Sequence, residues 1–413
     1  MAWRRILPAL ALLVLVILPL PVLASDQSPA APHACQGAAC RAQPAWTHLL
    51  HGTWAAGTSA GSTGNGGTVP AAGQAYVAAG GGVAVLGIGL SLAGYRLSDG
   101  KPLWRVTLAA PAGTAIMSVR AWLDVITVGL LGPGGNTRTE VVVATTTGTE
   151  VRRYPAAVFG GAVAASAGTT VVIGPAAVTS YANATGRVRW THKISAGQSW
   201  RADWPGLYLT QAPGGGLSSA PVTALKVINL VTGSVRTLSS VPGNPFSGTL
   251  AVAAGGTVIF ASPAGVTAYS GSTGGLLWTM RGAVPEGTDP VTGLVYLMSR
   301  KGVLLGVDPE TGIAATSVPR AVATGPAAVY VVTDGMALGL TSGANGQAWG
   351  YDLTAGRVTW NSAALPWPHF YSDLSGLGGS ASASDGTVLV TACPHLAASP
   401  GICADPELVA FSL

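Results

Sequence analysis

A few short patterns in the chain have the spacing of catalytic motifs, but their surroundings argue against catalysis. Gly57–Gly61 has the G-x-S-x-G spacing of a nucleophilic serine, yet it lies in a Gly/Ser/Thr-rich stretch without the strand and helix that such a serine needs. Ser98–Lys101 has the S-x-x-K spacing, but it is part of a repeated turn. The six histidines show no metal-binding spacing such as H-E-x-x-H. We therefore expect neither catalytic residues nor a metal site.

Two segments rich in aromatic and charged residues are the candidates for ligand binding. They are Gln198–Trp204 and Trp367–Asp373, and we expect both to connect strands on one face of a rigid scaffold. Aromatic, charged and histidine side chains on such loops are a usual composition for a binding surface. The alternative is that these aromatics only fill the packing at the ends of strands. The candidate ligand-binding residues are Trp200, Arg201, Asp203, Trp204, Trp367, His369, Tyr371 and Asp373.

An internal repeat supplies the elements that would position these residues. Each copy has the pattern of a strand, a tight turn that closes on glycine, and a second strand. Repeats of about 40–45 residues with strand-only content are typical of β-propeller blades. The clearest copies are Leu92–Trp104, Val178–Trp190, Val266–Trp278 and Ala348–Trp360, and weaker copies begin near Val141, Val227 and Leu304.

The turn and the tryptophan after it have physical reasons. Glycine adopts the positive φ that a tight hairpin requires. The tryptophan four residues later offers a large apolar contact to the neighbouring blade. We expect this structural role for Trp46, Trp104, Trp190, Trp278 and Trp360, and expect Arg152, Thr237 and Thr316 in the same place in the weaker copies.

The two ends of the repeat region carry incomplete copies. Gln43–Leu50 matches a tryptophan-bearing outer strand alone, and Pro406–Leu413 matches the strand that precedes a turn. Because the two pieces complete each other, we expect the N-terminal strand to pair beside the C-terminal one and to close the ring. The sequence thus predicts an all-β fold, an eight-bladed β-propeller of four-stranded antiparallel blades, with seven whole blades between Gln74 and Leu365 and one composite blade.

The repeat resembles the tryptophan-docking repeat of pyrroloquinoline-quinone-type (quinoprotein-like) propellers. Gly306–Gly312 matches the first half of that repeat, and Gly100–Trp104 matches the second. The resemblance implies a fold shared by quinone-dependent alcohol dehydrogenases and by a non-catalytic scaffold lipoprotein of outer-membrane protein assembly. The enzymes of this class carry adjacent cysteines, a calcium site of Glu and Asn, and a catalytic Asp. This chain has no adjacent cysteines and no visible calcium cluster among its 16 acidic residues. It therefore resembles the scaffold branch more, and pyrroloquinoline quinone with calcium is the less expected cofactor alternative.

The N-terminus predicts export. A basic start (Met1–Arg5), an apolar run (Ile6–Leu23) and small residues before Ser25 are typical of a signal peptide. The alternative is an uncleaved membrane anchor, because the apolar run is at the lower limit of a spanning length. We expect residues 1–24 to be a signal peptide, residues 25–41 a flexible leader, and residues 42–413 a single β-propeller domain.

Export makes disulfides the expected state of the four cysteines, which allow three connectivities. Cys393 and Cys403 would lie at the two ends of one loop of the composite blade. We therefore expect them to pair with each other, and Cys35 to pair with Cys40.

Composition limits the partners. The net charge of +5 is too small and too scattered for nucleic-acid binding. We expect a secreted or extracytoplasmic bacterial protein, a monomer that binds a protein or cell-envelope glycan through its loop-rich face, with membrane contact only if the N-terminal segment stays uncleaved. Two alternatives remain: a quinone-dependent oxidoreductase of the same superfamily, and a ring with a purely structural role.

Overall fold

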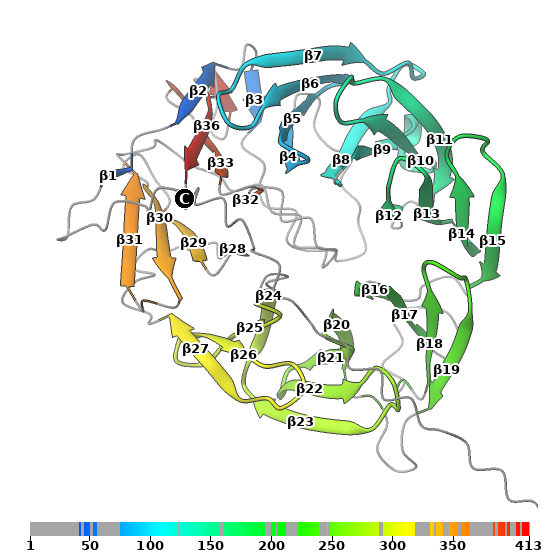
Figure 1. Cartoon of the computed structure of the whole chain (residues 1–413), viewed down its shortest axis with the longest axis vertical. Helices are drawn as coiled ribbons and strands as arrows, with labels where there is room; N and C mark the ends of the chain where they lie inside the picture. The colour runs from blue at the N-terminus through cyan, green and yellow to red at the C-terminus, as the bar shows by residue number, and fades with distance from the viewer. Residues whose placement is uncertain are drawn as a thin grey trace, which may run out of the picture. The chain divides into compact units, whose positions relative to one another are not determined.

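The repeats form four-stranded antiparallel sheets, the blades of an all-β propeller. The computed structural model describes residues 41–42, 45–49, 53–55, 75–122, 124–156, 161–174, 176–194, 200–203, 205–211, 222, 224–239, 246, 248–288, 292–318, 331–333, 336–341, 347–353, 355, 357–362, 383–384, 387–392, 395–396, 402–404 and 407–412. All of them belong to one compact unit, Cys35–Leu413. Within this unit the blades follow one another round a common centre, with the first strand of each blade innermost (Figure 1).

Seven blades consist of four strands that follow one another in the chain. From the inner to the outer strand, blades one to three contain β4 (Ala75–Gly80), β5 (Val83–Ile88), β6 (Ser91–Arg96) and β7 (Pro102–Thr107); β8 (Ala115–Ala121), β9 (Val125–Leu131), β10 (Arg138–Ala144) and β11 (Glu150–Ala156); and β12 (Gly161–Ala165), β13 (Thr169–Ile173), β14 (Ala177–Ala182) and β15 (Val188–Lys193). A short 3-10 turn, η1 (Pro133–Gly135), lies between β9 and β10.

Blades four to seven have the same arrangement. They contain β16 (Trp200–Asp203), β17 (Gly206–Gln211), β18 (Ala224–Asn229) and β19 (Val235–Ser239); β20 (Thr249–Ala254), β21 (Thr257–Ser262), β22 (Gly265–Ser270) and β23 (Leu276–Arg281); β24 (Val284–Thr288), β25 (Val295–Met298), β26 (Leu304–Val307) and β27 (Ala314–Val318); and β28 (Val331–Thr333), β29 (Met336–Thr341), β30 (Gln347–Asp352) and β31 (Arg357–Ser362).

The predicted count of eight blades, closed by one N-terminal strand, is wrong. Among the described residues, seven blades have the regular meander, and the chain ends form a different sheet in the order β2-β36-β33-β32. Its strands are β2 (Trp46–Leu49), β36 (Glu407–Ser412), β33 (Thr387–Ala392) and the two-residue β32 (Ala383–Ser384). The N-terminal residues do not act as one closing strand, because they are divided among three sheets.

The other N-terminal strands show this division. β1 (Arg41–Ala42) runs parallel to β31 and makes the sheet of blade seven five-stranded. β3 (Thr53–Ala55) pairs with β35 (Ile402–Ala404), which also pairs with β34 (His395–Leu396) in a separate three-stranded sheet. A meander forms from short hairpins, whereas joining the chain ends must overcome the entropy of closing a long loop. The repeat in the sequence therefore predicts the regular blades, but it does not predict how the terminal strands pair.

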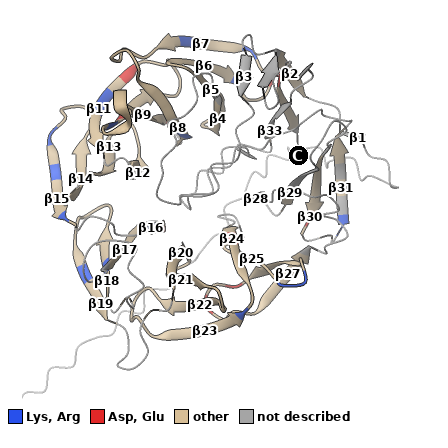
Figure 2. Ribbon diagram, turned by 180° about the vertical axis from the view of Figure 1, so that it is seen from behind, with Lys and Arg blue, Asp and Glu red and all other residues tan. Residues whose placement is uncertain are grey.

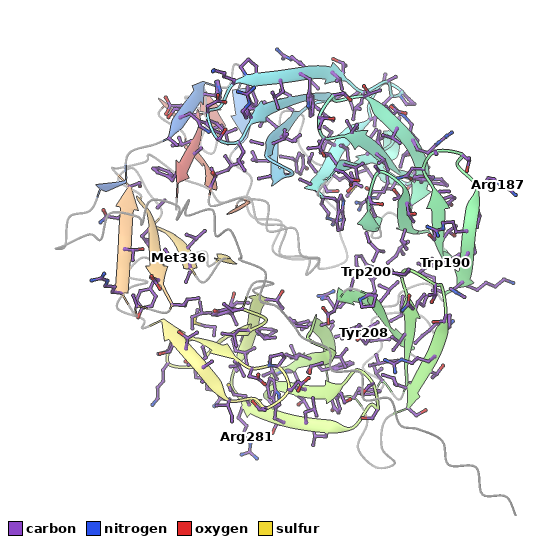
Figure 3. All side chains as sticks on the ribbon, viewed as in Figure 1. Arg187, Trp190, Trp200, Tyr208, Arg281 and Met336 are labelled. Atoms are coloured by element: carbon purple, nitrogen blue, oxygen red, sulfur yellow. The ribbon has the colours of Figure 1, made fainter. Side chains whose placement is uncertain are left out.

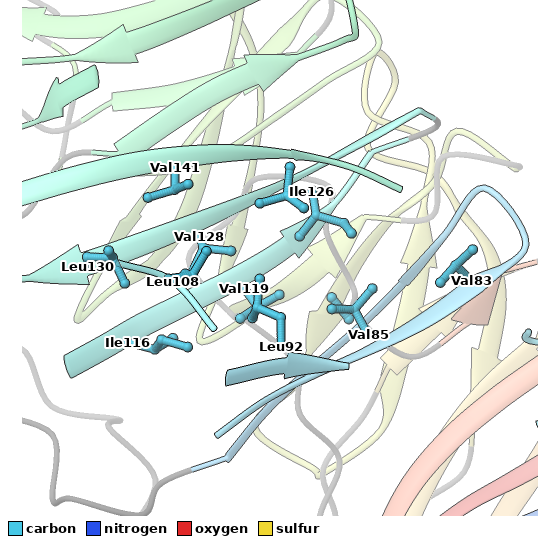
Figure 4. Packing of buried hydrophobic residues seen from close by; sticks show 12 residues of the cluster. Val83, Val85, Leu92, Leu108, Ile116, Val119, Ile126, Val128, Leu130 and Val141 are labelled. Atoms are coloured by element: carbon cyan, nitrogen blue, oxygen red, sulfur yellow. The ribbon is translucent and has the colours of Figure 1, made fainter. Parts of the chain in front are cut away.

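The hydrophobic core is divided between neighbouring blades. The cluster between blades one and two contains Val85 and Leu92 from the first and Ile126, Val128 and Val141 from the second (Figure 4). All seven residues of β9 are buried. A strand with neighbours on both faces loses the alternation of a half-exposed strand and becomes a continuous apolar run. Each blade therefore depends on its neighbours for burial.

Candidate functional site

The outer strand of each blade reaches the turn of the next blade through one side chain, which we call the docking residue. Trp46, Trp104 and Trp278 do so by donating Nε1–H to a backbone carbonyl. In each case the acceptor is the residue three positions before the turn glycine. The acceptors are Leu97 at 2.7 Å, Thr145 at 2.8 Å and Pro309 at 2.8 Å, which precede Gly100, Gly148 and Gly312. These tryptophans therefore hold adjacent blades together.

Arginine performs the same task in two blades. Arg152 donates to the carbonyls of Asn183 at 3.3 Å and Ala184 at 3.3 Å in the turn of blade three. Arg236 donates to the carbonyls of Gly271 at 2.7 Å and Ser272 at 3.3 Å in the turn of blade five. Thr237 was the expected docking residue of blade four, and that expectation is wrong.

The shift from Thr237 to Arg236 follows from the strand register. In blades one to three and five to seven, a bulge after the turn leaves one outer-strand residue unpaired. In blade one this residue is Leu103, because its neighbours Pro102 and Trp104 pair with the adjacent residues Tyr95 and Gly94. Blade four has no such bulge, and Arg236 pairs directly with Val227. Because a bulge inserts one residue, its absence moves the docking position one residue toward the turn.

The other docking residues fit this scheme with small differences. Thr316 donates its hydroxyl to the carbonyl of Leu353 at 3.2 Å. Trp190 packs over Gly233, but its Nε1 has no hydrogen-bond partner in the described part of the chain. His192, two residues after Trp190, contacts the carbonyl of Gly233. The Trp360 side chain lies outside the described residues.

The described part of the first predicted ligand-binding segment, Trp200–Asp203, forms a strand rather than a loop. Trp200, Arg201 and Asp203 belong to β16, the innermost strand of blade four (Figures 1 and 3). Arg201 donates Nε–H to the carbonyl of Ala251, and the Asp203 carboxylate accepts the Gly256 N–H at 3.1 Å. Both charged side chains thus fasten blade four to blade five. Trp200 is half-buried against the core between blades three and four.

The remaining predicted ligand-binding residues are Trp204, Trp367, His369, Tyr371 and Asp373, and they lie outside the described residues.

Burial at the interface between blades four and five shifts the pKa values of Arg201 and Tyr208. It lowers the pKa of the Arg201 guanidinium, because the charged form loses water. It also raises the pKa of the Tyr208 phenol, and the negative charge of Asp203 adds to that increase.

A buried ionic cluster between blades two and three was missed by sequence reasoning. Glu140 and Arg138, which are 1% and 8% exposed, form a salt bridge of 2.6 Å. Arg138 also donates to the Ser118 hydroxyl at 3.1 Å, and Arg120 donates to the Ala162 carbonyl of blade three at 3.4 Å. The signal was present in the sequence, since Arg138 and Glu140 are two residues apart and share one face of an otherwise valine-rich strand.

Two glycines make room for this cluster. A Cβ added to Gly129 would lie 2.6 Å from the Arg138 side chain, and one added to Gly161 would lie 2.7 Å from it.

The charge of Arg138 also acts on Tyr76 of blade one. Burial raises the pKa of Tyr76 to about 12, and Arg138 opposes the rise.

Comparison with known proteins identifies the repeat. Residues 197–393 match the family model described as outer membrane protein assembly factor BamB. These residues belong to the PQQ-type β-propeller repeat family. Blades four to seven, including β16 and the Arg236 contact, are therefore PQQ-type repeats. No curated protein matches the chain.

Several solved structures are similar to this chain at low identity. BamB from Moraxella catarrhalis is 19% identical, with 63% of this chain and 79% of that chain covered and a TM-score of 0.41. The quinohemoprotein alcohol dehydrogenase from Pseudomonas putida is 14% identical, with coverage of 83% and 76% and a TM-score of 0.46. That from Comamonas testosteroni is 12% identical, with coverage of 89% and 76% and a TM-score of 0.48.

PQQ-type repeats raise the question of a quinone and calcium site, for which carboxylate and amide oxygens would have to converge. The described inner strands carry two carboxylates, Asp203 on β16 and Glu286 on β24, which belong to different blades. Among the described residues no group of three or more His, Cys, Asp or Glu side chains lies close enough to hold a metal ion. The described residues therefore do not supply a calcium-ligand set.

Glu286 is the inner-strand carboxyl that keeps an unusual environment. It is half-buried, and the loss of water raises its pKa above the ordinary value. Such a group retains a proton at a higher pH than a surface glutamate does.

Other sequence-level features have a plain structural outcome. Asn183, in an N-x-T pattern, is fully buried; it accepts the Tyr154 hydroxyl at 2.6 Å and donates to the Ser166 carbonyl at 2.7 Å. Its amide is therefore not available for modification in the folded protein.

The side chains of all four cysteines lie outside the described residues. Within the described part of the chain, no helix has the length and hydropathy needed to cross a membrane.

Proposed function

We propose that this chain is an exported, non-catalytic β-propeller that binds a protein or cell-envelope ligand. It acts as a rigid ring, and its loop-rich face provides the contact surface. Trp204, Trp367 and Tyr371 are the proposed aromatic contacts on that face, and His369 and Asp373 are the proposed polar groups around them. Trp200, Arg201 and Asp203 pack or bond at the interfaces of β16 with the neighbouring blades, so we do not propose them as ligand contacts.

The observation that carries this proposal is the use of charged side chains on the inner strands. Arg201 and Asp203 bind the backbone of blade five, and Arg120 binds the backbone of blade three. An enzyme of this architecture needs charged groups that converge on an open centre. Here Arg120, Arg201 and Asp203 bond across the interfaces between blades, which suits a scaffold.

The family match supports the same proposal. The matching family model is named for an outer-membrane protein assembly factor. A protein-binding role and an extracytoplasmic location follow by analogy, and fold analogy alone is a weak guide to function. The proposal therefore depends mainly on the inner-strand contacts.

A cofactor titration tests the proposal. The purified chain without residues 1–24 is titrated with pyrroloquinoline quinone and Ca²⁺ while cofactor absorbance and tryptophan fluorescence are followed. We expect no calcium-dependent binding. Tight binding that requires calcium would overturn the scaffold proposal and favour an oxidoreductase.

A further inference from the structure

The outer strands of the propeller are edges of their sheets. β7, β15, β19 and β23 each have a neighbour on one side only. An edge strand presents unpaired backbone N–H and C=O groups, to which another extended chain can add. The perimeter of the ring is thus a set of equivalent sites for strand addition.

Blade seven shows that such an edge accepts an added strand. The N-terminal segment β1 lies beside the outer strand β31 and runs parallel to it, with Arg41 opposite Asn361 and Ala42 opposite Ser362. The outer edge of a blade therefore has the geometry to bind an extended segment. The corresponding edge of blade three, β15, has no added strand among the described residues.

The β15 edge differs from the others by its charge. Arg187, Arg189 and Lys193 are exposed, and Lys226 of the next blade lies beside them, since it donates to the Lys193 carbonyl at 3.1 Å. None of the four forms a salt bridge among the described residues; Arg189 instead donates to the hydroxyl of Thr169 at 2.7 Å. Figure 2 shows the cations along this strand, and Figure 3 shows Arg187 at the perimeter.

Several basic groups at the other edges have local partners, and β7 and β23 each keep one exposed arginine, Arg105 and Arg281, without a salt bridge among the described residues. On blade one, Arg96 and Lys101 both contact Asp99, at 3.0 and 3.4 Å. On β11, Arg153 is paired with Glu150 at 2.6 Å. On β19, Arg236 is engaged as a docking residue. The β15 edge is therefore the described edge where several positive charges remain available to an acidic partner.

An apolar residue completes this edge. Val188, at the start of β15, is 56% exposed. Because Lys226 covers the Lys193 carbonyl, the outer side of the backbone from Val188 to His192 is the part of this edge that carries no added strand among the described residues. A binding strand here would meet free backbone groups, one aliphatic side chain and cations at both ends.

We propose that the β15 edge binds an extended acidic peptide segment of a partner protein, which adds to blade three as a fifth strand. This rests on the proposed function in that the chain is a binding propeller, but it assigns a surface other than the loop-rich face. A peptide is favoured over an anionic membrane because only a peptide can use the backbone groups of the edge. The opposing explanation is that the cations merely keep other strands away from the edge.

The probe is a fluorescein-labelled peptide of alternating aspartate and valine, used with the full mature chain in fluorescence anisotropy. A second peptide has the same sequence with N-methyl groups on alternate backbone nitrogens, which removes strand pairing and leaves the charge. The test variant is Arg187→Glu/Lys193→Glu. The matched control is Arg105→Glu/Arg281→Glu, which makes the same charge change at exposed positions of β7 and β23.

Each exposed charge pair contributes little by itself. Because the test variant reverses two charges, we expect it to bind the acidic peptide about tenfold more weakly. The control variant should change the affinity by less than about twofold, the N-methylated peptide should not bind, and hydrogen exchange at Val188–His192 should slow when the peptide is bound. Equal losses in both variants, or equal binding of the N-methylated peptide, would overturn the proposal. So would binding only to phosphatidylglycerol vesicles, which would assign the edge to membranes. Each of these failures leaves the scaffold proposal standing, because that proposal fails only on calcium-dependent quinone binding.

Discussion

At the residue scale, the contact between blades depends on the position of a donor rather than on one residue type. Tryptophan, arginine and threonine all donate to the turn of the next blade. What they share is the same register within the blade, since Trp104 pairs with Gly94, Arg236 with Val227 and Thr316 with Gly306. The strand register therefore determines which residue is the docking residue, and the turn of the next blade provides the backbone carbonyl that accepts its hydrogen bond.

The docking position predicts different effects for two adjacent residues. Arg236→Ala removes two hydrogen bonds to backbone carbonyls, so the free energy of unfolding should fall by roughly 1–2 kcal/mol. Thr237→Ala, at an exposed neighbouring position, should change it by less than about 0.5 kcal/mol. Urea unfolding followed by tryptophan fluorescence measures both. A larger loss for Thr237→Ala would contradict the assignment.

Glu286 predicts a pH-dependent stability. Burial raises the pKa of Glu286 in the folded protein above its unfolded value, so the folded state binds more protons between the two pKa values. The free energy of unfolding therefore falls as the pH rises through that window. Glu286→Gln should raise the Tm at about pH 8 and leave it unchanged near pH 4, close to the unfolded pKa. A Tm difference that is the same at both pH values would show that burial of the charge is not the cause.

At the element scale, each turn must both close a hairpin and receive a side chain from the previous blade. Gly312 and Gly186 have φ values of +73° and +71°, which other residues adopt at a cost. The two glycines differ in how closely a side chain of the previous blade approaches them. A Cβ on Gly312 would lie 2.6 Å from Trp278, whereas one on Gly186 would lie at an ordinary 3.5 Å from Arg152.

This difference predicts unequal effects for the same substitution. Gly186→Ala should cost roughly 1 kcal/mol of stability through its positive φ alone. Gly312→Ala should cost about 1–3 kcal/mol more, because the added methyl group displaces Trp278. Denaturant unfolding of the two variants gives the comparison. Equal losses would mean that Trp278 moves aside without cost.

The interface between blades two and three depends on a buried charge pair. Glu140→Gln keeps the shape of the side chain but leaves the Arg138 guanidinium without its carboxylate. Breaking one partner of a buried pair typically costs about 3–5 kcal/mol. We expect a loss of this size in thermal unfolding. Glu150→Gln, which breaks the exposed pair with Arg153, is the control and should cost less than about 1 kcal/mol.

At the scale of the whole molecule, stability is distributed among the interfaces between blades. The terminal sheet takes part through Trp46, which is 8% exposed and packs in one cluster with Val77 and Leu86 of blade one and Leu408 of β36. The N-terminal segment is thus packed like a docking strand, although its strand β2 is not consecutive with the rest of its sheet.

This packing predicts that Trp46→Ala destabilises the whole unit. Loss of a buried tryptophan typically costs about 3–5 kcal/mol. Calorimetry should show one transition at lower Tm, with a loss similar to that of Trp104→Ala. Local fraying of the N-terminus, with the main transition unchanged, would contradict this expectation.

Local patterns allowed the blades to be predicted, and non-local contacts limited the prediction of the site. The strand pairs around Gly100, Gly186 and Gly274 lie where the repeat indicated. Trp200–Asp203 was interpreted as a connection because its aromatic and charged residues have the composition of a loop. The contacts of Arg201 and Asp203 with blade five explain that composition, and they join residues far apart in the chain.

By itself, the sequence determined the repeat: where each hairpin turns, which glycine closes it and, where the outer strand carries a bulge, which side chain faces the next blade. These features depend on residues within a few positions of one another, so local sterics and hydrophobic pattern are sufficient. Only the tertiary structure decided that the regular blades number seven among the described residues, that the N-terminal residues divide among three sheets, and that Arg120 of blade two reaches the Ala162 carbonyl of blade three. Those outcomes depend on the free energy of contacts between distant segments, for which a one-dimensional pattern carries no signal.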